Sequence, residues 1–412
     1  MDFAEIIRQL FDGVFQLMSV DGLKTLVMFA IAGILIALAI VKDYEPTLLL
    51  PIGFGCILAN LPKVLDILTG QMAPSALGEA GFLTVLFDAG IANELFPVLI
   101  FIAVGAMIDV SPLLKDPSTI FFGAAAQFGI FMTFMLALIL LPFLPDLFPN
   151  MESLQALRDN DMVMKLASAI GIIGAADGPT TLYVANYFKL EQYMAPISVA
   201  AYSYMALVPV IQPPVIKALT TREERMIRMD YQEERCSKTT LILFPIIVTI
   251  VAGIIVPMSA PLVGSLMFGN LIRECGVLER LSKTAQNELA NLVTIVLGIT
   301  IGGTMVAENF LRLETILILV LGLFAFVFDT AGGVIFAKIL NLFRKKKINP
   351  MVGAAGISAF PMSSRVIAKM ALKEDPSNFI LMQSTSANVS GQLGSIVAGG
   401  MVITLVSMLL GA

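Results

Sequence analysis

Long apolar stretches separated by short polar connections run along almost the whole chain. A helix that crosses a membrane needs about 20 predominantly apolar residues, and many of these stretches approach or exceed that length. The candidate spans are residues 25–41, 96–108, 119–145, 164–176, 194–216, 240–258, 291–306, 314–342, 351–372 and 378–410, with shorter stretches at 47–60 and 262–272. The pattern predicts an all-α polytopic membrane protein with about ten transmembrane helices, several of them broken by glycine or proline into re-entrant segments.

Two polar connections are strongly basic. Residues 217–238 contain four arginines, and residues 343–347 read FRKKK. The positive-inside rule predicts that both connections lie in the cytoplasm. An even number of apolar stretches separates them, so the two assignments agree.

The chain also contains an internal similarity. The sequence NELFPVLIFIAVGAM from Asn93 aligns with NELANLVTIVLGITIGGTM from Asn287, and GAADGPTT from Gly174 resembles GISAFPMSS from Gly356. We interpret this as a duplicated unit, inverted in the membrane if one span of the first copy is re-entrant. The predicted regions are an amphipathic interfacial helix (1–22), N-terminal membrane helices (23–90), a first repeat (91–218), the basic loop with connecting segments (219–286) and a second repeat (287–412).

Composition narrows the chemistry that the chain can perform. Of its 412 residues 57% are hydrophobic and only 14% are charged, which is typical of a membrane protein. Histidine is absent, and the three cysteines are too far apart for metal-ligand spacing. Zinc, haem, histidine-based catalysis and nucleic-acid binding are therefore not expected, and the cysteines are predicted to be free thiols.

One acid stands out in the apolar background. Asp177 lies in GIIGAADGPTT (171–181), among glycines and before Pro179. Irregular backbone is tolerated at membrane depth only where it is buried in protein or lines water, and intramembrane carboxylates usually mark ion pathways. Beside free carbonyls and the hydroxyls of Thr180 and Thr181, Asp177 is predicted to bind Na⁺ or a proton; a protonated acid that only joins two helices is the alternative.

Two later segments carry further polar residues. INPMVGAAGISAFPMSSRVIAK (348–369) has amide and hydroxyl oxygens suited to a cation and Arg365, which could attract an anion or snorkel to water. STSANVSGQLGSIVAGG (384–400) is rich in small residues, typical of close helix packing, but its Asn388 needs a partner. Asp329 is a weaker buried candidate, and Tyr202 and Tyr204 either face the same cavity or simply pack.

Taken together, GAADGPTTLYVANYF, AAYSYMALVPVIQPPVIKALT, INPMVGAAGISAFPMSSRVIAKMA and SANVSGQLGSIVAGG resemble the membrane beta subunit of the biotin-dependent, sodium-pumping decarboxylases. The resemblance extends from about residue 20 to the end of the chain. It implies that the subunit decarboxylates carboxybiotin with uptake of a proton and couples this reaction to Na⁺ export.

The resemblance also implies roles for individual residues. Asp177 and Asn388 would bind a first Na⁺, and Tyr204 and Ser358 a second Na⁺ or the proton. Asn349 and Gly353 occupy the family's Asn-Pro-x-x-Gly position, close to carboxybiotin and, for Asn349, to Na⁺. Arg365 would meet the carboxyl group of carboxybiotin, so Arg365, Asp177 and Tyr204 are the expected catalytic residues.

The implied partners are a biotin-carrier protein, a carboxyltransferase and a small membrane-anchoring subunit, in a bacterial or archaeal cytoplasmic membrane, with a homo-oligomer of this chain also conceivable. The chain has no biotin-acceptor sequence, so carboxybiotin is expected from a partner. A stand-alone Na⁺-coupled carboxylate symporter or Na⁺/H⁺ antiporter is the alternative, since it would share the duplication and the midplane acid. The sequence does not select among oxaloacetate, methylmalonyl-CoA and glutaconyl-CoA.

Overall fold

The computed structural model describes residues 20–62, 81–147, 155–229 and 236–411, together with residues 13, 17 and 64. Within these residues the regular structure is helical and contains no strand. The chain forms two compact units: unit 1 comprises Met1–Phe96 and Asn291–Ile316, and unit 2 comprises Pro97–Ala290 and Leu317–Ala412. The predicted interfacial helix 1–22 lies almost wholly outside the described residues.

Unit 1 is built on a helical hairpin. Its described helices are α3 (Val20–Lys42), α4 (Pro46–Asn60), α6 (Phe82–Leu86), a π-helix (Phe87–Ala92), α20 (Ala290–Thr304) and α21 (Ala307–Phe310). Gly55 of α4 lies against the backbone of α20 at Gly302, where a side chain would not fit. The amide of Asn60 donates to Met305 O (2.7 Å) and accepts from Ala307 N (2.9 Å), which satisfies the backbone where α20 gives way to α21.

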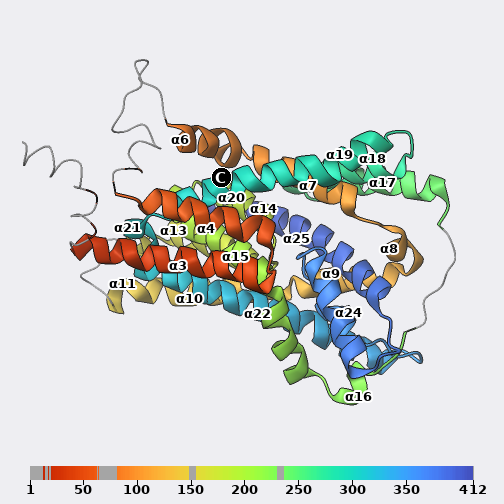
Figure 1. Cartoon of the computed structure of the whole chain (residues 1–412). Coiled ribbons are helices and arrows are strands. Elements are labelled where there is room, and N and C mark those ends of the chain that lie inside the picture. The colour runs from red at the N-terminus through yellow and green to blue at the C-terminus, as the bar shows by residue number, and fades with distance from the viewer. Residues whose placement is uncertain are drawn as a thin grey trace, which may run out of the picture. The chain divides into compact units, whose positions relative to one another are not determined.

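Unit 2 carries the polar segments. Its helices are α7 (Leu95–Met107), α8 (Ser111–Lys115), α9 (Ile120–Ala126), α10 (Phe128–Leu140), α11 (Leu144–Leu147), α13 (Asn160–Ile173), α14 (Gly178–Tyr187), α15 (Glu191–Leu219), α16 (Arg222–Arg225), α17 (Lys238–Ile255), α18 (Ala260–Glu274), α19 (Glu279–Thr284), α22 (Leu313–Phe343), α23 (Pro350–Ala354), α24 (Met362–Glu374) and α25 (Leu381–Leu410). The helix α25, blue in Figure 1, packs against α9, α13, α14 and α24. Its small residues permit this crowding, since Gly391 directly contacts the backbone of Gly356.

By length and composition, six of the described helices can cross a membrane, or seven if the bent pair Phe82–Ala92 and Leu95–Met107 is one span. The chain is therefore a multi-pass membrane protein, while the expected total of about ten helices stays a prediction. The expected span 351–372 is divided between α23 and α24, and the expected span 164–176 ends early, because α13 stops at Ile173 before α14 begins at Gly178. At 14 residues α13 is only about 21 Å long, too short to cross alone.

Candidate functional site

Asp177 lies where α13 has ended and α14 begins, as the sequence predicted for a broken helix. Its carboxylate caps α14: Thr180 N donates to Oδ1 (3.2 Å), and Thr180 Oγ1 donates to Oδ2 (2.7 Å). The hydroxyl of Thr181 donates instead to the backbone carbonyl of Asp177 (2.8 Å). Asp177 is only 3% exposed, so its charge is held away from solvent by neutral donors.

The helix α25 supplies further partners for the same carboxylate. Ser395 Oγ donates to Asp177 Oδ2 (2.6 Å), and Gln392 Nε2 lies 3.4 Å from the same atom. Asn388, Gln392 and Ser395 are spaced four and three residues apart and therefore share one face of α25. Three hydroxyl or amide groups from two helices thus converge on one carboxylate oxygen.

The second interrupted segment meets the first at this point. Ser358 N donates to Ala175 O (3.0 Å), which joins the loop between α23 and α24 to the loop between α13 and α14. Asn388 Nδ2 in turn donates to Ile357 O (2.7 Å). The structure therefore brings together Asp177, Ser358 and Asn388, which lie on three separate segments of the sequence.

Several buried oxygens around Asp177 have no hydrogen-bond partner among the described residues. These atoms are Ser358 Oγ, Asn388 Oδ1 and the hydroxyl of Tyr202. Ser358 lies in the loop that is hydrogen-bonded to Ala175, and the ring of Tyr202 lies against Gly178, the residue after Asp177. Unpaired buried oxygens are costly, so a site that keeps several of them beside one negative charge is suited to a cation.

The glycines of this segment act differently from the sequence-based interpretation. They were expected to open the backbone, but Gly174 is in the ordinary right-handed region and the left-handed residue is Ala176 (φ 53°). Gly174 instead lies against Ala325 of α22, and Gly178 lies against the ring of Tyr202. The interpretation was wrong because close helix packing, and not unusual φ angles, requires these glycines.

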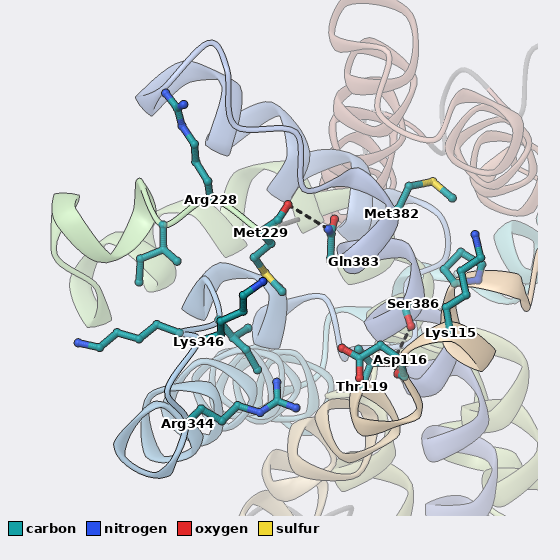
Figure 2. Close-up of a pocket in the computed structure, with 14 residues that line it drawn as sticks. Lys115, Asp116, Thr119, Arg228, Met229, Arg344, Lys346, Met382, Gln383 and Ser386 are labelled. Carbon is teal, nitrogen blue, oxygen red and sulfur yellow. Dashed lines mark hydrogen bonds between the residues drawn. The ribbon is translucent and has the colours of Figure 1, made fainter. Parts of the chain in front are cut away.

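A second polar region is a basic cavity of about 550 Å³ in unit 2. The residues that define its charge are Lys115, Asp116, Arg228, Arg344, Lys346 and Lys347. Figure 2 shows Arg228, Lys346 and Arg344 on one side of the view, and Thr119 and Ser386 beside Lys115 and Asp116 on the other. The hydroxyls of Thr119 and Ser386 are 2.6 Å apart, and Ser386 precedes Asn388 by two residues on α25. The two basic connections expected in the cytoplasm therefore border one cavity, whose lining includes α25 close to Asn388.

Ion pairs order the first of these connections. Arg228 Nε lies 2.7 Å from Asp375 Oδ2, and this hydrogen bond lowers the pKa of Asp375 below its usual value. Arg225 Nε lies 2.9 Å from Glu374 Oε1. Glu374 is the last residue of α24, and Asp375 follows it. The ion pairs therefore attach the first basic connection to α24, the helix that begins after the second interrupted segment.

Comparison with known proteins agrees with this arrangement. A family profile described as the Na⁺-transporting oxaloacetate decarboxylase beta subunit matches residues 24–406. The chain is 45% identical over 403 residues to the methylmalonyl-CoA decarboxylase subunit beta of Propionigenium modestum, covering 93% of this chain and 95% of that protein. It is 42% identical over 434 residues to the oxaloacetate decarboxylase beta chain of Haemophilus ducreyi, covering 94% and 96%.

The chain belongs to the Na⁺-transporting oxaloacetate decarboxylase beta subunit family. It is a membrane subunit of a decarboxylase complex with a Na⁺-translocating role, and the stand-alone transporter is not favoured. The resemblance inferred from the four motifs is confirmed.

Other residues expected in the site of this family member lie apart from Asp177. Tyr204 donates to Leu319 O of α22, and it is Tyr202, two residues earlier and on another face of α15, whose ring lies against Gly178 beside Asp177. Asn349 caps α23 through Met351 N (3.1 Å) and donates to Arg225 O (2.8 Å) and Ile227 O (2.9 Å), so it holds the basic connection.

Gly353 and Arg365 are also placed away from the carboxylate. Gly353 lies directly against the backbone of Gly333 in α22, and so allows α23 to pack there. Arg365 is exposed in the first turn of α24, one helical turn after Pro361. Ser395, Gln392 and Tyr202 were not assigned to Asp177 from the sequence, although the helical spacing of Gln392 and Ser395 from Asn388 was a usable signal.

Proposed function

We propose that this subunit decarboxylates carboxybiotin supplied by a partner, consumes a proton, and couples the reaction to Na⁺ export. The observation that carries the proposal is the buried carboxylate of Asp177, which lies at the meeting of two interrupted helices and is surrounded by neutral oxygens. A monovalent cation can replace its hydration shell with such oxygens without a second fixed charge.

The Na⁺ ligands in this proposal are Asp177, Ser358 and Asn388. Ser358 and Asn388 each have a buried oxygen without a partner, and both belong to segments joined to Asp177 or its neighbours by hydrogen bonds. Tyr202 borders the same carboxylate and is a candidate for orienting it. A role of Tyr204 and Asn349 in Na⁺ binding stays a prediction, and would require them to exchange the partners described above.

The basic cavity fits the approach of carboxybiotin. Five cations and one acid favour an anionic ligand, and a volume of about 550 Å³ is within the usual range for small-molecule sites. The hydroxyls of Thr119 and Ser386 offer hydrogen bonds for a polar ring. We propose that the cavity receives the ligand. A contact of Arg365, Asn349 or Gly353 with carboxybiotin stays a prediction, because none of the three lines the cavity.

When bound, carboxybiotin supplies an N-carboxylate that leaves as CO₂ while the ring nitrogen takes up a proton. The role of this chain is to remove the carboxylate from water, hold Na⁺ at Asp177 and deliver the proton.

We also propose that the chain is a duplicated, inverted pair of repeats. In support, an apolar helix that follows a π-helix and ends in irregular backbone lies near the start of both predicted repeats, 91–218 and 287–412: α7 after Phe87–Ala92, and α20 after Ala285–Leu289. Each half then ends with an interrupted helix and a long helix, namely α13, α14 and α15, then α23, α24 and α25. Cysteine accessibility from the two membrane faces would test the inversion.

The partners and the location follow from the proposal. Carboxybiotin must come from a biotin-carrier protein charged by a carboxyltransferase, with a small anchoring subunit in the complex, in a bacterial or archaeal cytoplasmic membrane. A complex purified through this subunit and placed in vesicles should take up ²²Na⁺ only while it decarboxylates oxaloacetate, methylmalonyl-CoA or glutaconyl-CoA. Avidin, which blocks biotin, should stop both activities together. Na⁺ uptake that continues under avidin would contradict the proposal and support a stand-alone transporter.

A further inference from the structure

A second buried carboxylate in unit 2 has no part in the site described above. Asp329 lies in the middle of α22 and is 1% exposed. Its Oδ1 atom accepts from Ile130 N (3.0 Å), at the start of α10. Gly129 is required there, because a Cβ atom would collide with Asp329. Asp329 therefore caps a helix that belongs to another part of the chain.

The other oxygen of Asp329 has no partner. Oδ2 is buried and makes no hydrogen bond with the described residues. The hydroxyls of Thr330, the next residue, and of Thr133, one turn beyond Ile130, are also buried without a partner. A carboxylate with one satisfied and one unsatisfied oxygen can be completed by a single proton on Oδ2.

The surroundings favour a proton over Na⁺ at this position. Three hydroxyl or amide groups converge on Oδ2 of Asp177, whereas none bonds to Oδ2 of Asp329. Na⁺ needs several oxygens to replace its hydration shell, but a proton needs one.

No cation among the described residues forms an ion pair with Asp329. The helices α9, α10 and α23 contain no charged residue. The charged residues on the other elements around Asp329 are Glu314 and Lys338 on α22, Asp161 and Lys165 on α13, Asp177 after α13, and Glu191 and Lys217 on α15. Tyr204 of α15, which is also titratable, lies against Gly322 of α22.

A short chain of contacts connects Asp329 with the interrupted segment before Asp177. Ala325, one turn before Asp329, lies against Gly174. Ile130, which donates to Asp329, lies through its carbonyl against Gly171 of α13. The helix before Asp177 therefore packs directly beside the surroundings of Asp329.

We propose that Asp329 is a proton-binding site in the membrane region, separate from the Na⁺ site at Asp177. The proposal deepens the proposed function, because that reaction consumes a proton, and it rests on that function for the proton's use. Protonation neutralises the buried carboxylate, and loss of the proton leaves an uncompensated charge in the apolar interior.

Dicyclohexylcarbodiimide, which reacts with protonated carboxyl groups in apolar surroundings, tests the proposal on the purified wild-type complex. Mass spectrometry should show labelling of Asp329 that falls as the pH is raised and is insensitive to Na⁺. Labelling of Asp177 should be suppressed by Na⁺, which tests the proposed function separately. Suppression of the Asp329 label by Na⁺, or labelling that does not change with pH, would overturn the proposal.

Asp329→Asn provides a second test, since the amide keeps the oxygen that caps α10 but cannot release a proton. We expect the variant complex to assemble. Its rate of decarboxylation should fall about tenfold and should no longer decrease as the pH is raised. The KM for Na⁺ should change less than about twofold. The exposed Asp161→Asn is the matched control. Wild-type rate and pH profile in Asp329→Asn would contradict the proposal, and if the variant fails to assemble, the labelling of the wild type decides.

Discussion

Asp177 and Asp329 are both buried carboxylates that accept a backbone N–H group at the start of a helix, but their second oxygens have opposite surroundings. Oδ2 of Asp177 receives Thr180 and Ser395 at 2.7 and 2.6 Å, whereas Oδ2 of Asp329 has no partner in the described part of the chain. The number of neutral oxygens around a carboxylate, and not burial alone, therefore separates the proposed cation site from the proposed proton site.

The largest expected effect is that of Asp177→Asn. Removal of the charge should cost roughly 3 kcal/mol or more of Na⁺ binding, which is about 100-fold in affinity. Na⁺-dependent decarboxylation by the assembled complex is the measurement. If decarboxylation by Asp177→Asn stayed dependent on Na⁺ while that of Asp329→Asn did not, the assignment of Na⁺ to Asp177 and of a proton to Asp329 would be wrong.

Ser395→Ala should have the next largest effect. It removes one hydroxyl from the Asp177 carboxylate and should raise the KM for Na⁺ about tenfold, because a hydrogen bond to a charged group contributes about 1.5–3 kcal/mol. Ser390→Ala is the matched control, since Ser390 lies on the same helix but donates to Thr119 O and Ala387 O. Equal Na⁺ titrations for both variants would argue against Ser395 as part of the site.

Gly174→Ala tests the close contact between the segment before Asp177 and α22, the helix that carries Asp329. The new Cβ atom would lie 2.6 Å from Ala325 Cβ, so α22 must shift, at a cost of about 1–3 kcal/mol in stability. Thermal unfolding of the purified subunit should show a lower Tm. Gly33→Ala in α3 meets no atom within 4 Å and should leave Tm unchanged or raised, because alanine is the better helix former. The same Tm for both variants would contradict the close contact.

The two tyrosines of α15 are expected to give the smallest effects. Tyr204→Phe removes a hydrogen bond to Leu319 O and should cost about 1 kcal/mol in stability. Tyr202→Phe removes a hydroxyl without a partner, so it should leave Tm within error and change the KM for Na⁺ by about twofold at most. Unfolding curves and Na⁺ titrations of both variants check this. If Tyr204→Phe changed the KM for Na⁺ more than Tyr202→Phe did, Tyr204 and not Tyr202 would belong to the Na⁺ site.

Much of the fold could be predicted from apolar length and from breaks in it. The interruptions near Asp177 and at 355–361 were visible as glycine and proline within apolar sequence, and the structure interrupts the helix at both. The bounds of the spans were less predictable, because α13 and α24 are short helices supported by their neighbours and not by their own length.

The candidate site was predictable in part. Asp177 was selected as an acid within a broken apolar stretch and Asn388 as an amide that needs a partner, while the motif resemblance assigned Ser358; the structure brings the three together. Tyr202 and Tyr204 could not be told apart, because a two-residue step around a helix places them on different faces whose neighbours are unknown until the helices pack. Ser395 was visible as one of many small polar residues, but nothing local pointed it toward Asp177.

The sequence by itself determined that this is an all-helical membrane protein of the decarboxylase beta subunit family, with an acid in a broken helix and two basic connections. Apolar length, charge position and motif order are local properties, so a single chain reveals them. Only the tertiary structure decided which oxygens surround Asp177, that the basic connections border one cavity, and that Asp329 caps α10 with one oxygen left open. These features depend on contacts between residues up to about 200 positions apart, which helix packing alone creates.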